Sequence, residues 1–432
     1  MAGRAQLAVS GRQEQFFTSN PDYTHFLEKF KRHSKFSRQY VDVESDNAFD
    51  FGSTTRFTIP QNQGDLLSSL SLKMKLPQIL TSNVCYIESV GHGIIEYVDL
   101  LIGGEIVQRL TSDYLQIHSE HYVTQTKQHA LEKLIGKYPR RTVDSKVCDP
   151  GILAYNFLGR TDKGNVDLFV DLPFYFYRHP KLAVPLCAIK KQEVEVEVKL
   201  RKLQNIVITD TGNYHTMTDD IHIKDFQLCT EVVFLDPCER LMIESKSSDY
   251  LITQIQDNIF NIDNDVNTLK VKLDFVNPVK ELYFVIQRYG TTGDGTTSGN
   301  FVTPFDYDNT TDVVNGKYTL YENLDYLELT LDGEDIIKKS TGNVIFLRAI
   351  QSAIHHSKTQ LLRRFYSYSF ALQPEEWYPT GQVNMSHVKE QILNLSLTPC
   401  STFSRQLRVY AESYNILRVS GGFAKTIFGT RH

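Results

Sequence analysis

The stretch QEVEVEVKL, residues 192–200, alternates apolar and charged side chains without a break. Its apolar positions are Val194, Val196, Val198 and Leu200. Successive side chains of a β-strand point to opposite faces of a sheet, so this spacing predicts a strand with one buried face and one face in water. If fully buried, each of these side chains would stabilise the fold by about 1.5 to 3 kcal/mol, as an upper estimate.

Similar strand patterns recur along the chain, at residues 56–76, 94–110, 268–290 and 390–397. The residues between these strand patterns are typical of turns. Gly103-Gly104 favours a hairpin because glycine accepts positive φ, and Asn277-Pro278 interrupts an apolar run. In form and relative position, residues 268–290 repeat residues 56–76, and residues 390–397 repeat residues 192–200. This repetition indicates two sequential copies of one domain.

Two segments have helical patterns instead. Residues 112–135 predict a helical insertion that ends at Gly136. A short helix is expected from Asn20, with Pro21 at the first helical position and a basic far end.

Strands of this length and spacing, joined by long loops, favour two-sheet jelly rolls over a propeller. The predicted fold is all-β: two consecutive eight-stranded antiparallel jelly rolls (a double jelly roll) with short helical insertions. The predicted division is an N-terminal arm with a short helix (1–37), a first jelly roll (38–212) and a second jelly roll (213–432). The connection between the jelly rolls is expected near residues 209–220.

Composition narrows the function classes. A formal charge of -5 on 432 residues, without a long Lys/Arg block, argues against direct binding of nucleic acid. The six cysteines are scattered and form no CxxC pair, so they are expected to be reduced and mostly buried thiols. The N-terminus lacks a signal-peptide core, which favours synthesis in a reducing cytosol. We expect no cofactor.

Several blocks resemble the major capsid proteins of nucleocytoplasmic large DNA viruses, the group of iridoviruses, phycodnaviruses and mimiviruses. The N-terminal block, SGRQEQFFTSNPDYTHFLEKFKRHSKFS (10–37), has Gly11, Gln13, Asn20, Pro21, Phe26, Arg32, His33 and Phe36 at the positions of that family's motif. The other similar blocks occur in family order at 168–198, 232–256, 277–287, 366–386 and 407–428.

This resemblance implies a non-enzymatic, structural major capsid protein of the virion. Three copies would form a pseudo-hexagonal capsomer of an icosahedral shell around an internal membrane and a double-stranded DNA genome. The implied partners are further copies of the chain, neighbouring capsomers, and minor capsid and penton proteins, with the internal viral membrane nearby and assembly in the host cytoplasm. Direct contact with nucleic acid is not implied.

Some residues are candidates for assembly or exposure. A role on the inner face of the shell is expected for Asn20, Pro21, Phe26, Phe30, Arg32, His33 and Phe36. The Gly-rich run 289–300 and its polar neighbour 306–317 predict outer loops, with Gly290, Gly293, Gly295, Gly299 and Asn309 as their marker residues. Asn309 begins a formal sequon and is the candidate glycosylation site.

Two alternatives stay open. Departures from the family pattern at Arg363, Arg364 and His387 allow a minor double-jelly-roll capsid component. A different class, a two-jelly-roll protein that binds or hydrolyses glycans, would use acid pairs such as Glu334-Asp335 and Glu375-Glu376 beside aromatic residues such as Trp377.

A metal site is a weaker candidate. His118 and His121 have the spacing of two ligands on one helix face, and His355-His356 forms an adjacent pair. Neither pair has an evident third ligand. Exposed histidines are therefore expected on the helix, and no metal site is predicted.

Overall fold

The computed structural model divides into two compact units, Met1–Phe36 and Ser37–His432. The residues described are 2–9, 11–28, 30–79, 84–87, 89–137, 142–143, 146–147, 165–209, 221–288, 305, 307, 313–314, 317–318, 322–358, 365–399 and 404–429. Of the connection expected at 209–220, only Thr209 lies in these ranges.

The N-terminal unit contains two short helices, α1 (Ala2–Ala8) and α2 (Arg12–Thr18). The prediction of a helix beginning at Asn20 is wrong. Asn20 has a left-handed φ of +50°, and an isolated bridge joins Thr24 to Leu27. Phe26 is 93% exposed, so packing does not offset the cost of nucleating a short helix here.

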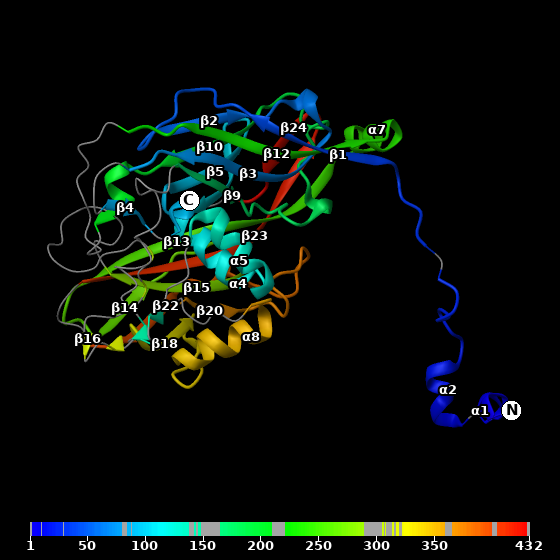
Figure 1. Ribbon diagram of the computed structural model, residues 1–432. Coiled ribbons are helices and arrows are strands. Elements are labelled where there is room, and N and C mark those ends of the chain that lie inside the picture. The colour runs from blue at the N-terminus through cyan, green and yellow to red at the C-terminus, as the bar shows by residue number, and fades with distance from the viewer. Residues whose placement is uncertain are drawn as a thin grey trace. The chain divides into compact units, whose positions relative to one another are not determined.

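Two four-stranded sheets form the first half of the larger unit (Figure 1). Their strand orders are β1-β12-β3-β9 and β2-β10-β5-β6. The strands are β1 (Phe36–Val43), β2 (Thr54–Thr58), β3 (Leu66–Leu76), β5 (Ile95–Ile102), β6 (Glu105–Thr111), β9 (Val166–Asp171), β10 (Val194–Leu200) and β12 (Asp225–Leu235).

The second half repeats this arrangement, with orders β13-β23-β15-β20 and β14-β22-β18-β19. Its strands are β13 (Ser248–Ile262), β14 (Thr268–Lys272), β15 (Pro278–Arg288), β18 (Leu324–Leu331), β19 (Glu334–Ile337), β20 (Phe365–Ser369), β22 (Gln391–Leu397) and β23 (Arg405–Ser420). Two short strands, β21 (Val383–Asn384) and β24 (Phe423–Thr426), extend the first of these sheets.

The two halves share one topology. Counted along the chain within each half, strands one, eight, three and six form one sheet, and strands two, seven, four and five form the other. The predicted repeat and the double jelly roll are therefore confirmed. Strand β12 follows residue 213 in the sequence, yet it pairs with β3 and completes the first jelly roll.

The stretch 192–200 behaves as its alternation predicts. Val194, Val196 and Val198 are fully buried in β10, which pairs with β2 and β5. The hairpin prediction is also confirmed, since β5 and β6 join through Gly103 and Gly104 at φ +60° and +83°.

Three two-stranded ribbons complete the sheet structure of the described segments. They pair β4 (Val84–Tyr86) with β11 (Val207–Thr209), β7 (Thr142–Val143) with β8 (Lys146–Val147), and β16 (Val313–Val314) with β17 (Lys317–Tyr318). Short 3-10 turns occur at η1 (Gln61–Gln63), η2 (Pro180–Leu182), η3 (Leu203–Asn205) and η5 (Met385–His387).

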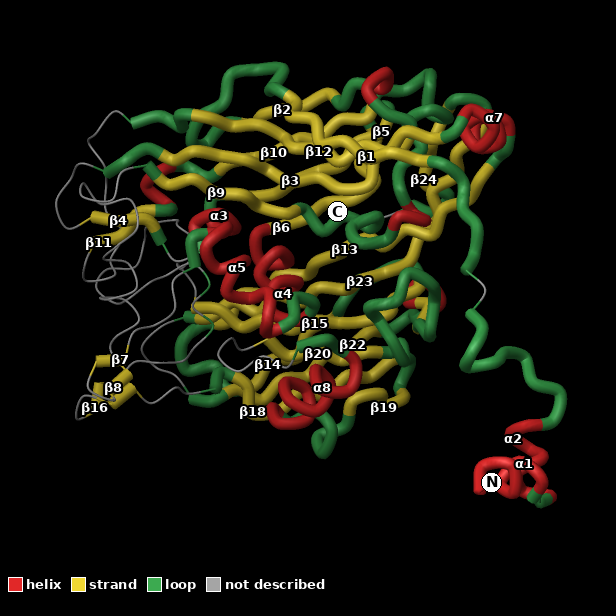
Figure 2. The backbone as a smooth tube through the Cα atoms, turned by 45° about the vertical axis from the view of Figure 1, so that its right-hand side comes forward, coloured by secondary structure: helices red, strands yellow, loops and turns green. Residues whose placement is uncertain are grey.

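The predicted insertion at 112–135 consists of two helices, α4 (Ser112–His121) and α5 (Gln125–Ile135), and α5 ends at Gly136 with φ +72°. The others are α3 (Val90–Gly93), α7 (Pro237–Ser245) and α8 (Gln351–His355), with a π-helical turn η4 (Phe346–Ile350) leading into α8. In both views α4 and α5 lie between the two jelly rolls (Figures 1 and 2). Among the helices of the described segments, none is long and apolar enough to cross a bilayer.

Two hydrophobic cores hold the larger unit together. One fills the second jelly roll, with Leu282, Phe284 and Leu407 among its members. The other fills the first jelly roll and continues across the junction to Tyr283 and Val285. Strand β15 therefore has both faces buried, one against its own partner sheet and one against the first jelly roll.

Candidate functional site

Among the described residues, most buried charged side chains gather at the junction between the jelly rolls, where α4 packs on the outer face of β15 and β23. Helix α4 begins after Thr111, whose side chain accepts a hydrogen bond from the Tyr114 backbone N–H at 3.4 Å. This start places Asp113, only 3% exposed, against the sheet of the other jelly roll.

Asp113 is the centre of one polar cluster. It forms an ion pair with Arg408, and it accepts hydrogen bonds from Tyr410 at 3.1 Å and Gln287 at 3.0 Å. Burial alone would raise the pKa of Asp113, but the positive charges of Arg408 and Arg201 hold it below its usual value. The ionised carboxylate of Asp113 in the first jelly roll thus binds the guanidinium of Arg408 in the second.

A second cluster surrounds Glu281. Its carboxylate lies 2.6 Å from His356 Nε2, and both side chains are fully buried. Tyr283 donates to Glu281 at 2.9 Å, and Glu375 lies 3.6 Å from the other ring nitrogen of His356. Burial would lower the pKa of His356, but Glu281 and Glu375 raise it to about 9, so this histidine is protonated at neutral pH.

Further buried polar contacts surround α4, and two of them cross to the second jelly roll, from Tyr122 to Glu412 and from Glu120 to Lys358. Lys280 lies 2.7 Å from Glu412, and Tyr122, next to α4, donates to Glu412 at 3.2 Å. Glu120 of α4 binds Lys137 at 2.6 Å and Lys358 at 3.0 Å. Such pairs are directional, so they fix the relative orientation of the two jelly rolls in a way that apolar packing alone does not.

The prediction that the α4 histidines are exposed is wrong. His121 is fully buried, and its ring lies 4.7 Å from the His356 ring. His118 faces a cavity between the jelly rolls and stacks on Tyr122 at 4.6 Å. Burial lowers the pKa of His118 to about 3 and that of His121 to about 4. Within the described ranges, no cluster of three or more His, Cys, Asp or Glu side chains could hold a metal ion.

The acid pairs considered for glycan hydrolysis are held in different ways. Glu375 and Glu376 line a cavity of about 140 Å³ together with Trp377. Glu375 accepts hydrogen bonds from Ser357, and together with His356 these lower its pKa. A general acid needs a raised pKa, so Glu375 is not prepared for that role. Glu334 and Asp335 are exposed on β19.

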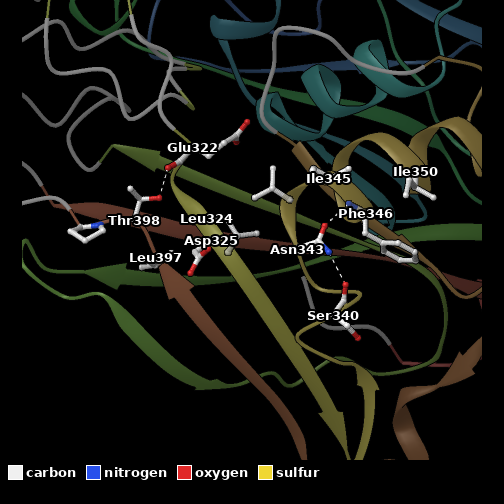
Figure 3. A pocket seen from close by; sticks show the side chains of 12 residues that line it. Glu322, Leu324, Asp325, Ser340, Asn343, Ile345, Phe346, Ile350, Leu397 and Thr398 are labelled. Atoms are coloured by element: carbon white, nitrogen blue, oxygen red, sulfur yellow. Dashed lines mark hydrogen bonds between the residues drawn. The ribbon is translucent and has the colours of Figure 1, made fainter.

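A larger groove lies on the second jelly roll, at the ends of β18 and β22 beside η4 (Figure 3). Its volume is about 800 Å³. Apolar side chains dominate the lining, among them Leu324, Ile345, Phe346, Ile350 and Leu397.

The other sequence candidates belong to the N-terminal unit or lie outside the described residues. In the N-terminal unit, Phe26, Phe30 and Phe36 are 93%, 83% and 55% exposed, and Asn20, Pro21, Arg32 and His33 are exposed as well. The outer-loop candidates Gly290, Gly293, Gly295, Gly299 and Asn309 are not among the described residues. Cys187, Cys229 and Cys238 are free thiols, of which Cys187 alone is buried.

Sequence reasoning missed the junction residues. Glu281 and Glu412 stand next to apolar or aromatic residues in strands that also carry other polar side chains, so the sequence gives only a weak signal of buried pairing. Their partners are not neighbours in sequence, however, and only the packing of the two jelly rolls brings them together.

The fold and its buried junction define a double-jelly-roll protein with its two sandwiches fixed to each other. Residues 24–236 match the family described as "Major capsid protein N-terminus", and residues 239–425 match "Large eukaryotic DNA virus major capsid protein". The chain belongs to the major capsid protein family of the large eukaryotic DNA viruses.

Individual relatives agree. The chain is 26% identical to the major capsid protein of Phaeocystis pouchetii virus, over 97% of this chain and 98% of that protein. It is 28% identical to the major capsid protein of Pyramimonas orientalis virus, over 97% of each. The crystal structure of PBCV-1 VP54 superimposes with a TM-score of 0.74 at 19% identity, over 94% of this chain and 100% of that one, which shows a common fold.

Proposed function

We propose that this chain forms a homotrimeric, pseudo-hexagonal capsomer of an icosahedral virion shell around an internal membrane and a double-stranded DNA genome. The main support is the matched strand order of the two jelly rolls, held together by the buried junction. Three chains with two similar sandwiches each would present six similar units around a closed three-fold axis. The family and the fold point to a structural role.

We also propose a revised division of the chain. Because β12 pairs with β3, the first jelly roll would run from residue 38 to Leu235, and the second would begin at Asp236. The matches to the two family descriptions, which meet between residues 236 and 239, support this division.

The N-terminal unit is proposed to act on the inner face of the shell. Its aromatic side chains are exposed, and large exposed apolar groups commonly mark protein contacts. The proposed partners are neighbouring capsomers, minor capsid proteins and penton proteins, near the internal membrane, with assembly in the host cytoplasm. The segments 289–304 and 308–317 are proposed to face outward, whereas Phe305 and Tyr307 between them are buried in the core of the first jelly roll.

Light scattering of the purified chain tests the trimer. With a chain mass of 49.6 kDa, three copies give about 150 kDa. The interface should be obligate and bury on the order of 2,000 Å² or more, so the trimer should persist on dilution. A stable 50 kDa monomer would contradict the proposal.

A further inference from the structure

The contact between the two jelly rolls of one chain has a simple layout. Helix α4 lies in the connection between the fifth and sixth strands of the first jelly roll, and it covers the outer face of β15 and β23 in the second. Beside it, β13 lies against β6, with Gln254 Nε2 donating to the Val107 carbonyl at 2.7 Å.

The same elements exist a second time. The segment η4–α8 lies in the connection between the fifth and sixth strands of the second jelly roll, β19 and β20, and so corresponds to α4. The sheet β1-β12-β3-β9 of the first jelly roll corresponds to β13-β23-β15-β20. Within one chain, η4–α8 does not pack on the sheet β1-β12-β3-β9 in the way that α4 packs on β15 and β23 (Figure 2).

The exposures reflect this difference. On the covered sheet face, Tyr283 and Gln287 are at most 1% exposed. On the corresponding face of the first jelly roll, Tyr40 is 69% exposed, and the side chains of Lys73 and Asp42 are 47% and 44% exposed. That outer face pairs charges within itself, as in Lys73 with Asp42, but it remains open to solvent.

The η4–α8 segment is correspondingly apolar on its exposed side. Ile345, Ile350 and Ile354 are 71%, 41% and 66% exposed, and the π-turn brings residues five apart into register along the helix. Leu372, 76% exposed, lies next to them, since its carbonyl is 3.1 Å from His355 Nδ1. We call Ile345, Ile350, Ile354 and Leu372 the isoleucine stripe; two of its members line the groove in Figure 3.

The charges are complementary. Residues 338–358 contain four Lys or Arg and no carboxylate; Arg348 and Lys358 are paired within the chain, and Lys338 and Lys339 are exposed. The outer face of β1-β12-β3-β9 carries five carboxylates and three cations. These are Asp42, Asp167, Asp171, Asp225 and Glu231, with Arg38, Lys73 and Lys75.

We propose that the isoleucine stripe of one copy docks on the outer face of β1-β12-β3-β9 of a second copy. This contact between two chains corresponds to the contact that α4 makes within one chain. Three such contacts between three copies would close a ring. The inference rests on the proposed trimer and identifies its interface.

Charged substitutions on the stripe test the contact. Ile350→Glu with Ile354→Glu should shift the mass from about 150 kDa to about 50 kDa, because the substitutions add negative charge where acidic residues must approach. Leu241→Glu on α7, also an exposed apolar position, is the matched control and should stay trimeric. Circular dichroism should show the same strand content in both variants.

Crosslinking gives an independent readout. Cys229 lies on the proposed receiving face, and Ile354→Cys would place a second thiol opposite it. In a Cys238→Ser background, a short bifunctional maleimide should produce covalent dimers and trimers, and Cys229→Ser should abolish them.

The outcomes separate the two proposals. A monomeric wild-type chain would overturn the trimer. A wild-type trimer that survives the double glutamate substitution and gives no Cys229-dependent crosslink would overturn this interface alone. The same holds if the substitution blocks only shell assembly, because the stripe would then bind a neighbouring capsomer or a minor protein.

Discussion

At the scale of single residues, the stability of the junction depends on buried ion pairs, in which each charged side chain is neutralised by a partner of opposite charge. Asp113 and Arg408 form one such pair, with side chains 5% and 11% exposed. Asp113→Asn leaves a buried guanidinium without its counter-charge, which typically costs about 3 to 5 kcal/mol. Urea unfolding should show this loss. Asp249→Asn, which breaks a half-exposed pair with Arg418, should change the unfolding midpoint little, and equal losses in the two variants would contradict this account.

His356 gives the junction a dependence on pH. Its pKa is raised to about 9 in the folded chain, so its stabilisation is complete below the unfolded value of about 6.5 and is lost as pH rises through 9. The loss could reach about 3 kcal/mol. Unfolding free energy should therefore fall between pH 6.5 and 9, and His356→Gln should flatten that decline. An unchanged slope in the variant would contradict the assignment.

The buried histidines of α4 act in the opposite direction. His118 and His121 have lowered pKa values of about 3 and 4, so the unfolded chain binds more protons below pH 6.5. Stability should fall as pH drops from 6.5 through 4, and His121→Gln should reduce this acid-side loss. Glu281, Glu375 and Asp113, with lowered pKa values, add to the same side, so the effect of one substitution should be partial.

At the scale of elements, strands were predictable where alternation is local. For the valines of β10 and the Gly103-Gly104 turn, a pattern of a few neighbouring residues is enough to predict the structure. Helix α4 was predictable as a helix, but its surroundings were not, because Asp113 and Glu120 meet partners that arrive from the other jelly roll. The helix expected from Asn20 failed because its apolar side chains have nothing to pack against within the N-terminal unit.

The connection that carries the isoleucine stripe depends on one glycine. A side chain at Gly342 would overlap the backbone carbonyl of Leu327 in β18, and Leu327 donates its N–H to the Gly342 carbonyl at 2.9 Å. Gly342→Ala should therefore displace η4 from β18 and lower the melting temperature by several degrees. Gly429→Ala, where a methyl group meets nothing within 4 Å, is the control. Equal melting temperatures for the two variants would contradict this prediction, because they would show that β18 shifts to accept the methyl group without loss of stability.

At the scale of the whole molecule, the chain uses one strand order twice but buries only one of two corresponding sheet faces. The buried face is rich in ion pairs, and the open face is charged as well. A charged face of this kind is well hydrated while it is exposed. Once a partner covers it, its ion pairs and hydrogen bonds specify the orientation of that partner. The asymmetry explains how two similar sandwiches can form both a fixed internal junction and a face available to another copy.

The N-terminal unit offers the last prediction, because its role is separable from the fold of the body. Residues 1–36 carry six Lys or Arg and three Asp or Glu, a net charge of +3, which leaves -8 on the rest of the chain. Deleting residues 1–20 removes α1 and α2 but no member of either hydrophobic core. The variant should keep the trimer mass and the melting temperature of the full chain while shell assembly, followed by electron microscopy, declines. Replacing the same residues with a Gly/Ser segment of equal length separates loss of these side chains from loss of length. Normal shells from the deleted chain would rule out an inner-face role for this segment.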